Sequence, residues 1–328
     1  MRLSLRRGTV TAVTPHEELL HLSVDGRPAI AYPRLTGPVE VGDEVIVNVQ
    51  ARTLGLGSGG FDVLYVNLTR GLDAGGEPDA HVMSLPYTPL QTATRHVEED
   101  GPLVETLDGL PVVCCTVHSQ VAPVCAGLRR RRLRVAYVQV AGGALPVSLS
   151  DALRALKREG LISIAVAVAP CLDGDEQAVT VASALAWAGG QGYDAVVSSV
   201  GPGIVGTASP FGHGGLAAAD VANTARALGG EPILAVRYSD VDSRERHRGV
   251  SHHTRSVLGL CSPGVTIAWP HGLDAPEWLD PREEVDVEGW HEDCGRLPLS
   301  HMGRGLEDDP CFFMTAFAAG RVARERVA

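Results

Sequence analysis

Hydrophobic residues follow two different rhythms along this chain of 328 residues. In the first part, short alternating runs predict half-buried strands, and Asp25-Gly26 is typical of a tight hairpin turn between two of them. The predicted strands cover residues 8–13, 19–24, 29–35, 43–49 and 61–68. So many strands in so short a segment predict a small β-barrel-like domain over residues 1–70.

Residues 71–109 are predicted to connect this domain to the rest of the chain. Within them, Thr88 fits an N-cap, Pro89 the first helical position and Gln91 the third, which together form a helix start signal. We therefore expect a helix from Thr88 to Glu99 that bridges the two domains.

From Leu110 onward, continuous apolar runs alternate with helical patterns that end at glycine. Apolar, β-branched runs with helices between them predict a parallel sheet covered on both faces. The runs lie at 112–117, 133–140, 162–169, 195–200, 233–236 and 265–269, and the helices at 148–159, 176–188 and 216–228. The predicted fold class is therefore α/β, with a doubly wound, mostly parallel, Rossmann-like sheet over residues 110–275. Residues 276–328 form a C-terminal tail in which Asp309-Pro310 opens a docking helix over 311–327.

Charge and composition narrow the function classes. With 28 basic and 39 acidic residues, the net charge of −11 disfavours nucleic acid and favours a small ligand or a protein partner. Because no apolar run reaches the roughly 18 residues of a membrane span and Met1–Arg7 lacks a signal-peptide core, we expect no membrane association and a cytoplasmic location. The only lysine, Lys157, lies in a helix pattern, which argues against phosphate-loop and Schiff-base enzymes.

Residues 201–215, read GPGIVGTASPFGHGG, lie between a predicted strand and a predicted helix. Such a glycine-rich loop exposes backbone N–H groups to an anion. We assign ligand binding to Gly201, Gly203, Gly206, Thr207, Gly212 and Gly214. The match to G-x-G-x-x-G does not indicate a nicotinamide cofactor, because Pro202 removes a donor and the helix begins near Gly214. The cofactor is left unidentified.

Histidines gather in the loops that follow strands, and these loops share one edge of a parallel sheet. The segment 237–254 adds arginines that suit phosphate or carboxylate. Adjacent helix residues point about 100° apart, so only one of His252 and His253 is expected to face a ligand. Catalytic acid/base roles are assigned to His118, His213 and His253, and ligand contacts to Asp240, Arg244, Arg248 and His252.

Metal binding and catalysis by a cysteine thiol are two further possibilities at the same edge. His118, His213, Asp240 and His253 could meet around a metal, but no local histidine pairing supports this, and no metal ligand is assigned. The seven cysteines contain no C-x-x-C pair, so reduced thiols are expected. Cys171 alone is placed like a nucleophile, and Asp173 and Asp175 should raise its pKa.

The glycine loop, the run Arg244-Glu-Arg-His-Arg-Gly-Val-Ser-His-His-Thr254, Leu85-Pro-Tyr-Thr-Pro-Leu-Gln91 and Met302-Gly-Arg-Gly305 resemble an uncharacterised bacterial family, domain of unknown function 3866. The resemblance runs over nearly the full length. It implies no assigned activity, and it implies that the connector and the tail belong with the sheet.

Two functions remain in competition. The first is a protein that binds a small anionic ligand, a phosphorylated metabolite or nucleotide, at the carboxyl edge of the sheet, as a hydrolase or transferase with a histidine acid/base. The second is a non-catalytic ligand sensor or an oligomeric scaffold, in which the barrel supplies the partner surface. A homo-oligomer is expected in either case.

Overall fold

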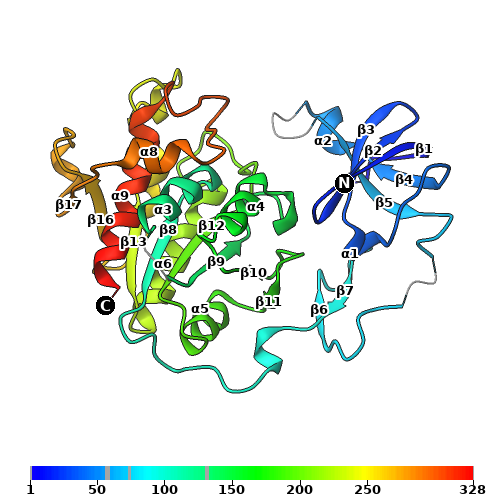
Figure 1. Cartoon of the computed structure of the whole chain (residues 1–328), viewed down its shortest axis with the longest axis horizontal. Helices are drawn as coiled ribbons and strands as arrows, with labels where there is room; N and C mark the ends of the chain where they lie inside the picture. The colour runs from blue at the N-terminus through cyan, green and yellow to red at the C-terminus, as the bar shows by residue number, and fades with distance from the viewer. Residues whose placement is uncertain (1, 56–59, 73–74, 130–132, 328) are drawn as a thin grey trace. The chain divides into compact units, whose positions relative to one another are not determined.

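A computed structural model describes residues 2–55, 60–72, 75–129 and 133–327. Positions 1, 56–59, 73–74, 130–132 and 328, which fall within the predicted domain ranges, lie outside the described residues. The chain forms two compact units, Met1–Ala80 and His81–Ala328 (Figure 1).

The first unit is a closed barrel, as predicted. Valines that point inward from successive strands, such as Val10, Val24 and Val45, are fully buried and form its core. The predicted strand over 29–35 ends early, because Pro33 cannot donate to a strand ladder and instead opens α1 (Pro33–Thr36). The strands are β1 (Leu5–His16), β2 (Leu19–Val24), β3 (Arg27–Ala31), β4 (Glu44–Asn48) and β5 (Asp62–Asn67), closed in the order β1-β2-β3-β5-β4, with α2 at Gln50–Thr53.

The predicted bridging helix from Thr88 to Glu99 is wrong. In its place the chain forms a short antiparallel pair, β6 (Val82–Ser84) and β7 (Thr92–Thr94), followed by a single 3-10 turn, η1 (Val97–Glu99). Tyr87 has φ of 58°, and the Thr88 hydroxyl donates to the carbonyl of Leu85, 2.9 Å away, instead of capping a helix. The threonine therefore closes one turn, and the proline lies in the next turn, which runs from Thr88 to Gln91.

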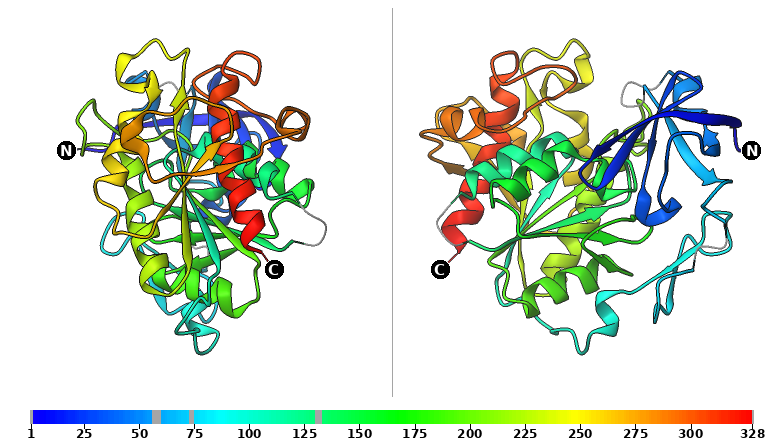
Figure 2. Two further views of the ribbon diagram at one scale, coloured as in Figure 1. Left: turned by 90° about the vertical axis from the view of Figure 1, so that its left-hand side faces the viewer. Right: turned by 45° about the vertical axis from the view of Figure 1, so that its right-hand side comes forward.

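The second unit is built on an all-parallel sheet, which confirms the predicted α/β fold class (Figure 2). Its central strands are buried on both faces, which explains their continuous apolar sequences. The strands are β8 (Pro111–Cys115), β9 (Val135–Val140), β10 (Ile164–Val168), β11 (Glu176–Ala178), β12 (Ala195–Val200), β13 (Glu231–Ala235), β16 (Thr266–Pro270) and β17 (Glu283–Val285), in the order β11-β10-β9-β12-β8-β13-β16-β17.

Helices cover both faces of this sheet. One face carries α3 (Val121–Gly127), α4 (Asp151–Arg158), α8 (Trp290–Gly295) and α9 (Pro310–Arg326), and the other carries α5 (Val181–Gly190), α6 (Ala217–Ala227) and α7 (His252–Leu258). The helix predicted at 176–188 begins later, because Glu176–Ala178 pair with β10 and Thr180 then caps α5. The helix predicted at 311–327 is present, with Asp309 at its N-cap position.

The order of the strands creates a switch point at the carboxyl ends of β8 and β12. From β8 the chain moves outward through β9, β10 and β11, whereas from β12 it moves through β13, β16 and β17 in the opposite direction. The two loops that follow β8 and β12 therefore leave the sheet toward opposite faces. In open α/β sheets, ligands bind at such a reversal.

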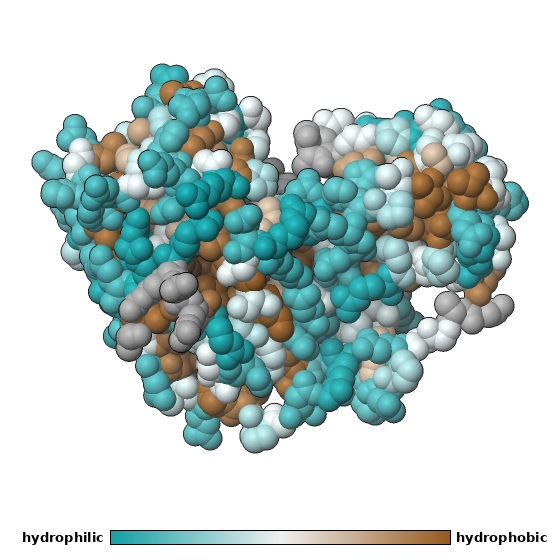
Figure 3. All heavy atoms as spheres, in the orientation of Figure 1, coloured by the Kyte–Doolittle hydropathy of each residue, from teal (hydrophilic) through white to brown (hydrophobic). Residues whose placement is uncertain are grey.

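Among the described residues, none of the helices combines the length and the apolar character needed to cross a bilayer. Figure 3 shows hydrophobic side chains scattered among hydrophilic ones on the visible face.

Candidate functional site

Two glycines of the predicted anion loop are needed for backbone packing. A Cβ atom on Gly201 would lie 2.0 Å from the carbonyl oxygen of Ala144, and one on Gly214 would lie 2.0 Å from that of Gly142. Any side chain at these positions would separate the loop after β12 from the loop after β9. The close backbone packing thus explains why glycine is needed at both positions. Their contact with a ligand stays a prediction.

The middle of the glycine loop closes on itself and is mostly exposed. Thr207 donates its backbone N–H to the carbonyl of Gly212, 2.6 Å away, and its hydroxyl donates to the same oxygen at 3.2 Å. Gly206 pairs with His213 as an antiparallel bridge, and Gly203 takes a positive φ of 67°. This closure places His213, which is buried, at the base of the loop.

His213 meets both histidines at the start of α7. Its ring stacks on that of His253 with centroids 3.8 Å apart, and the ring of His252 lies 5.5 Å away. One possible ligand atom from each of the three residues lies within 4.8 Å of the others. His252 and His253 were expected to point away from each other, yet both rings lie within 5.5 Å of the His213 ring. A rotation of about 100° around a helix still lets adjacent side chains approach the same third ring. That only one of them contacts a ligand stays a prediction.

Three ring nitrogens of His213 and His252 lack hydrogen-bond partners among the described residues. Within the described part of the chain, neither ring nitrogen of His213 has a partner, and Nε2 of His252 has none, although all three atoms are buried. Buried polar atoms are nearly always satisfied, so such a group calls for an explanation. Such nitrogens in a cluster of three imidazoles make it a candidate site for ligand binding.

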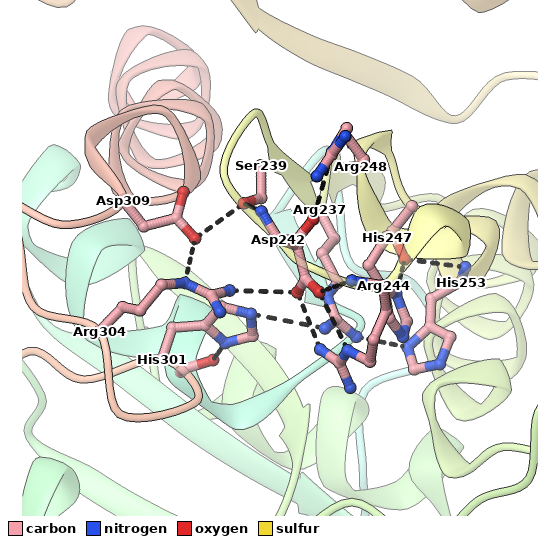
Figure 4. A network of polar contacts seen from close by, with 12 residues as sticks. Arg237, Ser239, Asp242, Arg244, His247, Arg248, His253, His301, Arg304 and Asp309 are labelled. Carbon is pink, nitrogen blue, oxygen red and sulfur yellow. Dashed lines mark hydrogen bonds and ion pairs between the residues drawn. The ribbon is translucent and has the colours of Figure 1, made fainter.

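Arg237, just after β13, holds one ring of this cluster in place. Its guanidinium donates to Nδ1 of His253 at 3.0 Å and to Nε2 of His301 at 3.4 Å (Figure 4). His301 in turn donates from Nδ1 to the hydroxyl of Ser119, 2.9 Å away. Arg237 is only 4% exposed, and among the described residues it makes no ion pair with a carboxylate. A buried cation here is thus held by neutral partners.

The local chain path explains why α7 begins beside Arg237. The strands β14 (Tyr238–Ser239) and β15 (Gly249–Val250) pair and return the chain, so that the N–H of Ser251 donates to the carbonyl of Arg237 at 2.8 Å. The Ser251 hydroxyl then caps α7 by accepting from the N–H of His253, and it lies 2.7 Å from Nδ1 of His247. One serine thereby fixes two histidines.

Burial keeps the histidines around Arg237 neutral. It lowers the pKa of His253 to about 2, and it lowers those of His247 and His301 to about 3. The positive charge of Arg237 acts in the same direction in each case. Burial also lowers the pKa of Arg237, to about 10, which leaves the guanidinium charged at neutral pH.

The other arginines of the segment 237–254 are already paired within the protein. Asp242 accepts from Arg244 at 3.0 and 2.8 Å and from Arg304 at 3.1 Å, and these bonds hold its pKa well below the usual range. Arg304 also contacts Asp309, which accepts from the Ser239 hydroxyl at 2.9 Å (Figure 4). This network joins the segment to the start of α9.

Two further predicted ligand residues lie at the outside of this network. Arg248 is exposed and donates to the backbone carbonyl of Asp242 at 3.3 Å. Asp240 is exposed as well, and its carboxylate adds to the effect of burial in raising the pKa of Cys311. Neither shares a hydrogen bond with the three histidines in the described residues, so their ligand roles stay predictions.

His118 occupies the switch point between β8 and β12. Its Nδ1 donates to the carbonyl of Val200 at 3.1 Å, and its Nε2 accepts from the hydroxyl of Ser150 at 2.6 Å. Burial lowers its pKa to about 4. In the described chain, no hydrogen bond or ring contact joins it to His213 or His253. The three predicted acid/base residues thus form one pair and one separate histidine.

Several residues of the network escaped the sequence analysis. Arg237 and His247 lie within a segment that was singled out, but nothing in the pattern ranked them above their neighbours. His301 and Arg304 come from the polar tail, where no periodic signal exists. Asp309 does occupy the predicted N-cap position, yet its carboxylate bonds to Ser239 and Arg304 and makes no cap.

Comparison with known proteins identifies the family and no activity. No curated protein matches this chain. The family described as "Protein of unknown function (DUF3866)" matches residues 28–320, a range that includes the glycine loop, the three histidines, Arg237 and the Asp242 network. This match covers nearly the whole chain, and the protein belongs to the family DUF3866.

Proposed function

We propose that this protein binds a small anionic ligand, a phosphorylated metabolite or nucleotide, at the carboxyl edge of the parallel sheet, with Arg237 as its charged anchor. The observation that carries the proposal is the buried guanidinium of Arg237, which has two imidazole acceptors and, among the described residues, no carboxylate partner. Burying an uncompensated charge is costly, and an anion at this place would offset that cost.

Arg237 differs in this respect from its neighbours. Arg244 and Arg304 are already neutralised by Asp242 and Asp309, so their charges hold the loop together. The two acceptors of Arg237 are neutral rings, and the carboxylate that attracts its charge, Asp242, is already paired with Arg244 and Arg304. An anion that approaches this edge therefore meets one unneutralised cation, together with the field of the arginines around it.

The neighbouring histidine supports the same assignment. Because Arg237 donates to Nδ1 of His253, the neutral ring carries its proton on Nε2 and presents an N–H donor. The N–H groups of Thr207, Gly212 and Gly214 bond within the protein, so any backbone donors from the exposed glycine loop come from its other residues. A guanidinium, an imidazole N–H and backbone amides are donors that suit phosphate oxygens.

If the protein is an enzyme, hydrolysis or group transfer with His213 as general base is the version that this arrangement supports. Burial lowers the pKa of His213, so its ring is neutral and able to accept a proton near pH 7. The alternative is a sensor that grips the anion through Arg237 and needs no base. A homo-oligomer and a cytoplasmic location stay predictions under both versions.

Isothermal titration calorimetry of metal-free protein with inorganic phosphate, pyrophosphate and ADP tests the binding claim. We expect at least one of these anions to bind the wild-type chain, Arg237→Lys to weaken binding and Arg237→Met to abolish it. Arg7→Met is the matched control, because Arg7 is an exposed residue of the barrel paired with Glu44. Circular dichroism checks that each variant is folded.

Two results would overturn the proposal: no heat with any of the three anions, or equal affinities for the wild type and a folded Arg237→Met. His213→Ala separates the enzyme from the sensor. Loss of phosphate-ester turnover with retained anion binding supports the enzyme, whereas absence of turnover in the wild type supports the sensor.

A further inference from the structure

We call His213, His252 and His253 the three-histidine cluster. Binding an anion at Arg237 does not require three imidazole rings in one place. A ring from the loop after β12 and two rings from α7 lie with possible ligand atoms within 4.8 Å of one another. Three of their six ring nitrogens are buried without a partner among the described residues. A single anion anchored on Arg237 would leave this feature unexplained.

Neutral imidazoles offer lone pairs, and a divalent transition-metal ion is the partner that uses three of them at once. The donor set is all nitrogen, without a carboxylate or thiolate, which favours an ion of borderline softness such as Zn²⁺ over Mg²⁺ or Ca²⁺. We propose that the three-histidine cluster binds one such ion, and that the anion of the proposed function lies between this ion and Arg237. The second half of this inference rests on the anion binding of the proposed function and not on its catalytic version, because a metal-bound His213 has no lone pair left to act as a general base.

The ring orientations show which residue must move. The rings of His213 and His253 are nearly parallel, with an angle of 12° between their planes. A metal lies close to the plane of each imidazole that binds it, so two parallel stacked rings cannot both bind the same ion. The backbone of Pro210 acts on the His213 ring without forming a well-aligned hydrogen bond, whereas His253 accepts one from Arg237 at 3.0 Å. His213 is therefore the ring that turns.

Arg237 couples the metal to the anion. While it donates to Nδ1 of His253, the Nε2 atom of that neutral ring carries the proton and has no lone pair for a metal. The cationic guanidinium also repels a nearby ion. An anion between the two takes over the N–H donors of Arg237 and screens the repulsion, and the proton of His253 then moves to Nδ1. Metal and anion should each strengthen the binding of the other.

His247 stands beside this cluster without being one of its proposed ligands. Its ring lies 4.8 Å from that of His252 and 5.0 Å from that of His253, and its Nδ1 contacts the Ser251 hydroxyl at 2.7 Å. Because Ser251 also accepts from the N–H of His253, the two residues support the position of α7 at the site. Such supporting contacts orient metal ligands in other proteins.

Titration of the metal-free protein with Co²⁺ tests the inference, since Co²⁺ reports imidazole coordination by its visible absorption. We expect one Co²⁺ per chain and competition by Zn²⁺. His213→Ala and His252→Ala should each weaken binding by at least about 100-fold, the upper end of the loss seen when only supporting residues are changed. His271→Ala is the control, because His271 is an exposed histidine outside the cluster.

A second Co²⁺ titration, with inorganic phosphate present, tests the coupling between metal and anion. Phosphate should raise the Co²⁺ affinity of the wild type by about tenfold, within the usual range of coupling between two sites, and should have no effect on Arg237→Met. Binding of phosphate without any Co²⁺ binding would overturn the metal site and leave the proposed function intact. Co²⁺ binding that survives in the double variant His213→Ala/His252→Ala would also overturn it. Co²⁺ binding with no phosphate binding would instead refute the proposed function and the coupling.

Discussion

A Cβ atom on Gly320 of α9 would lie 2.0 Å from the backbone carbonyl oxygen of Val124 in α3. The contact is reciprocal, because a Cβ atom on Gly127 would lie 2.3 Å from the carbonyl of Phe317. The two helices thus touch backbone to backbone, and this packing holds α9 against the sheet beside the site.

Gly320→Ala should destabilise the second unit by about 1–3 kcal/mol, the usual cost of overpacking, even though alanine is the better helix former. Urea denaturation measures this loss. Gly259→Ala is the control, because a Cβ atom there would meet its nearest neighbour at an ordinary 3.5 Å. Equal stability of the two variants would contradict the close helix contact.

Acidification should weaken the protein through His118. Burial holds its pKa at about 4, below the ordinary value of 6.5, so the unfolded chain takes up this proton at a higher pH than the folded chain does. The stabilising contribution of His118 is complete above about pH 6.5 and is lost as the pH falls to 4. It amounts to roughly 3 kcal/mol.

His118→Asn isolates this contribution from those of the other histidines. The variant should be less stable than the wild type at pH 7, because Val200 and Ser150 lose their partner, and the difference should shrink toward pH 4. Chemical denaturation at several pH values gives both curves. Curves that stay parallel would show that the pKa of His118 is the same in the folded and unfolded states, which would contradict the effect of burial.

Asp242→Asn should cost about 2 kcal/mol at neutral pH, because it breaks the bidentate bond to Arg244 and the ion pair to Arg304 around a buried carboxylate. Since the pKa of Asp242 is lowered in the folded state, the difference should fall as the pH drops below about 4. Asp280→Asn breaks a more exposed pair with Arg282 and should cost less than about 1 kcal/mol. Thermal unfolding of both variants compares them.

Cys171 should be inert in the folded protein. It is 1% exposed, and burial raises its pKa to about 12, which leaves almost no thiolate at neutral pH. Burial is the main cause, rather than the aspartates expected to act on it. Mass spectrometry after iodoacetamide treatment should show Cys171 modified only in denatured protein, with the half-buried Cys261 and Cys311 reacting first. Rapid labelling of Cys171 in the folded protein would contradict this prediction and would support a nucleophilic role for its thiol.

Most of the fold was predictable because buried parallel strands have continuous apolar sequences. Ala195–Val200, for example, is a strand with the predicted bounds. The edge strands β11 and β17 escaped prediction because each has only three residues, and Glu176 and Glu283 open them. A strand that is paired on one side only and polar in sequence carries no periodic signal.

The sequence predicted the parts of the site that lie within single loops, but not the contacts between distant segments. The glycine loop and the segment 237–254 do lie at one edge, because the topology of a parallel sheet places them there. The contact between Arg237 and His301 joins positions 64 residues apart, and no local pattern encodes it. The convergence of His252 and His253 on His213 depends on where the loop puts the third ring, which sequence spacing alone does not describe.

The network around Asp242 joins residues that are synthesised at different times. Arg304 and Asp309 leave the ribosome after every strand of the sheet, so the segment 237–254 emerges before the partners that hold it. A chain that ends before residue 304 lacks both of these partners, and it also lacks α9, which packs against β8, β13 and β16. The segment 237–254 is thus held in place only once residues 304 and 309 have been added to the chain.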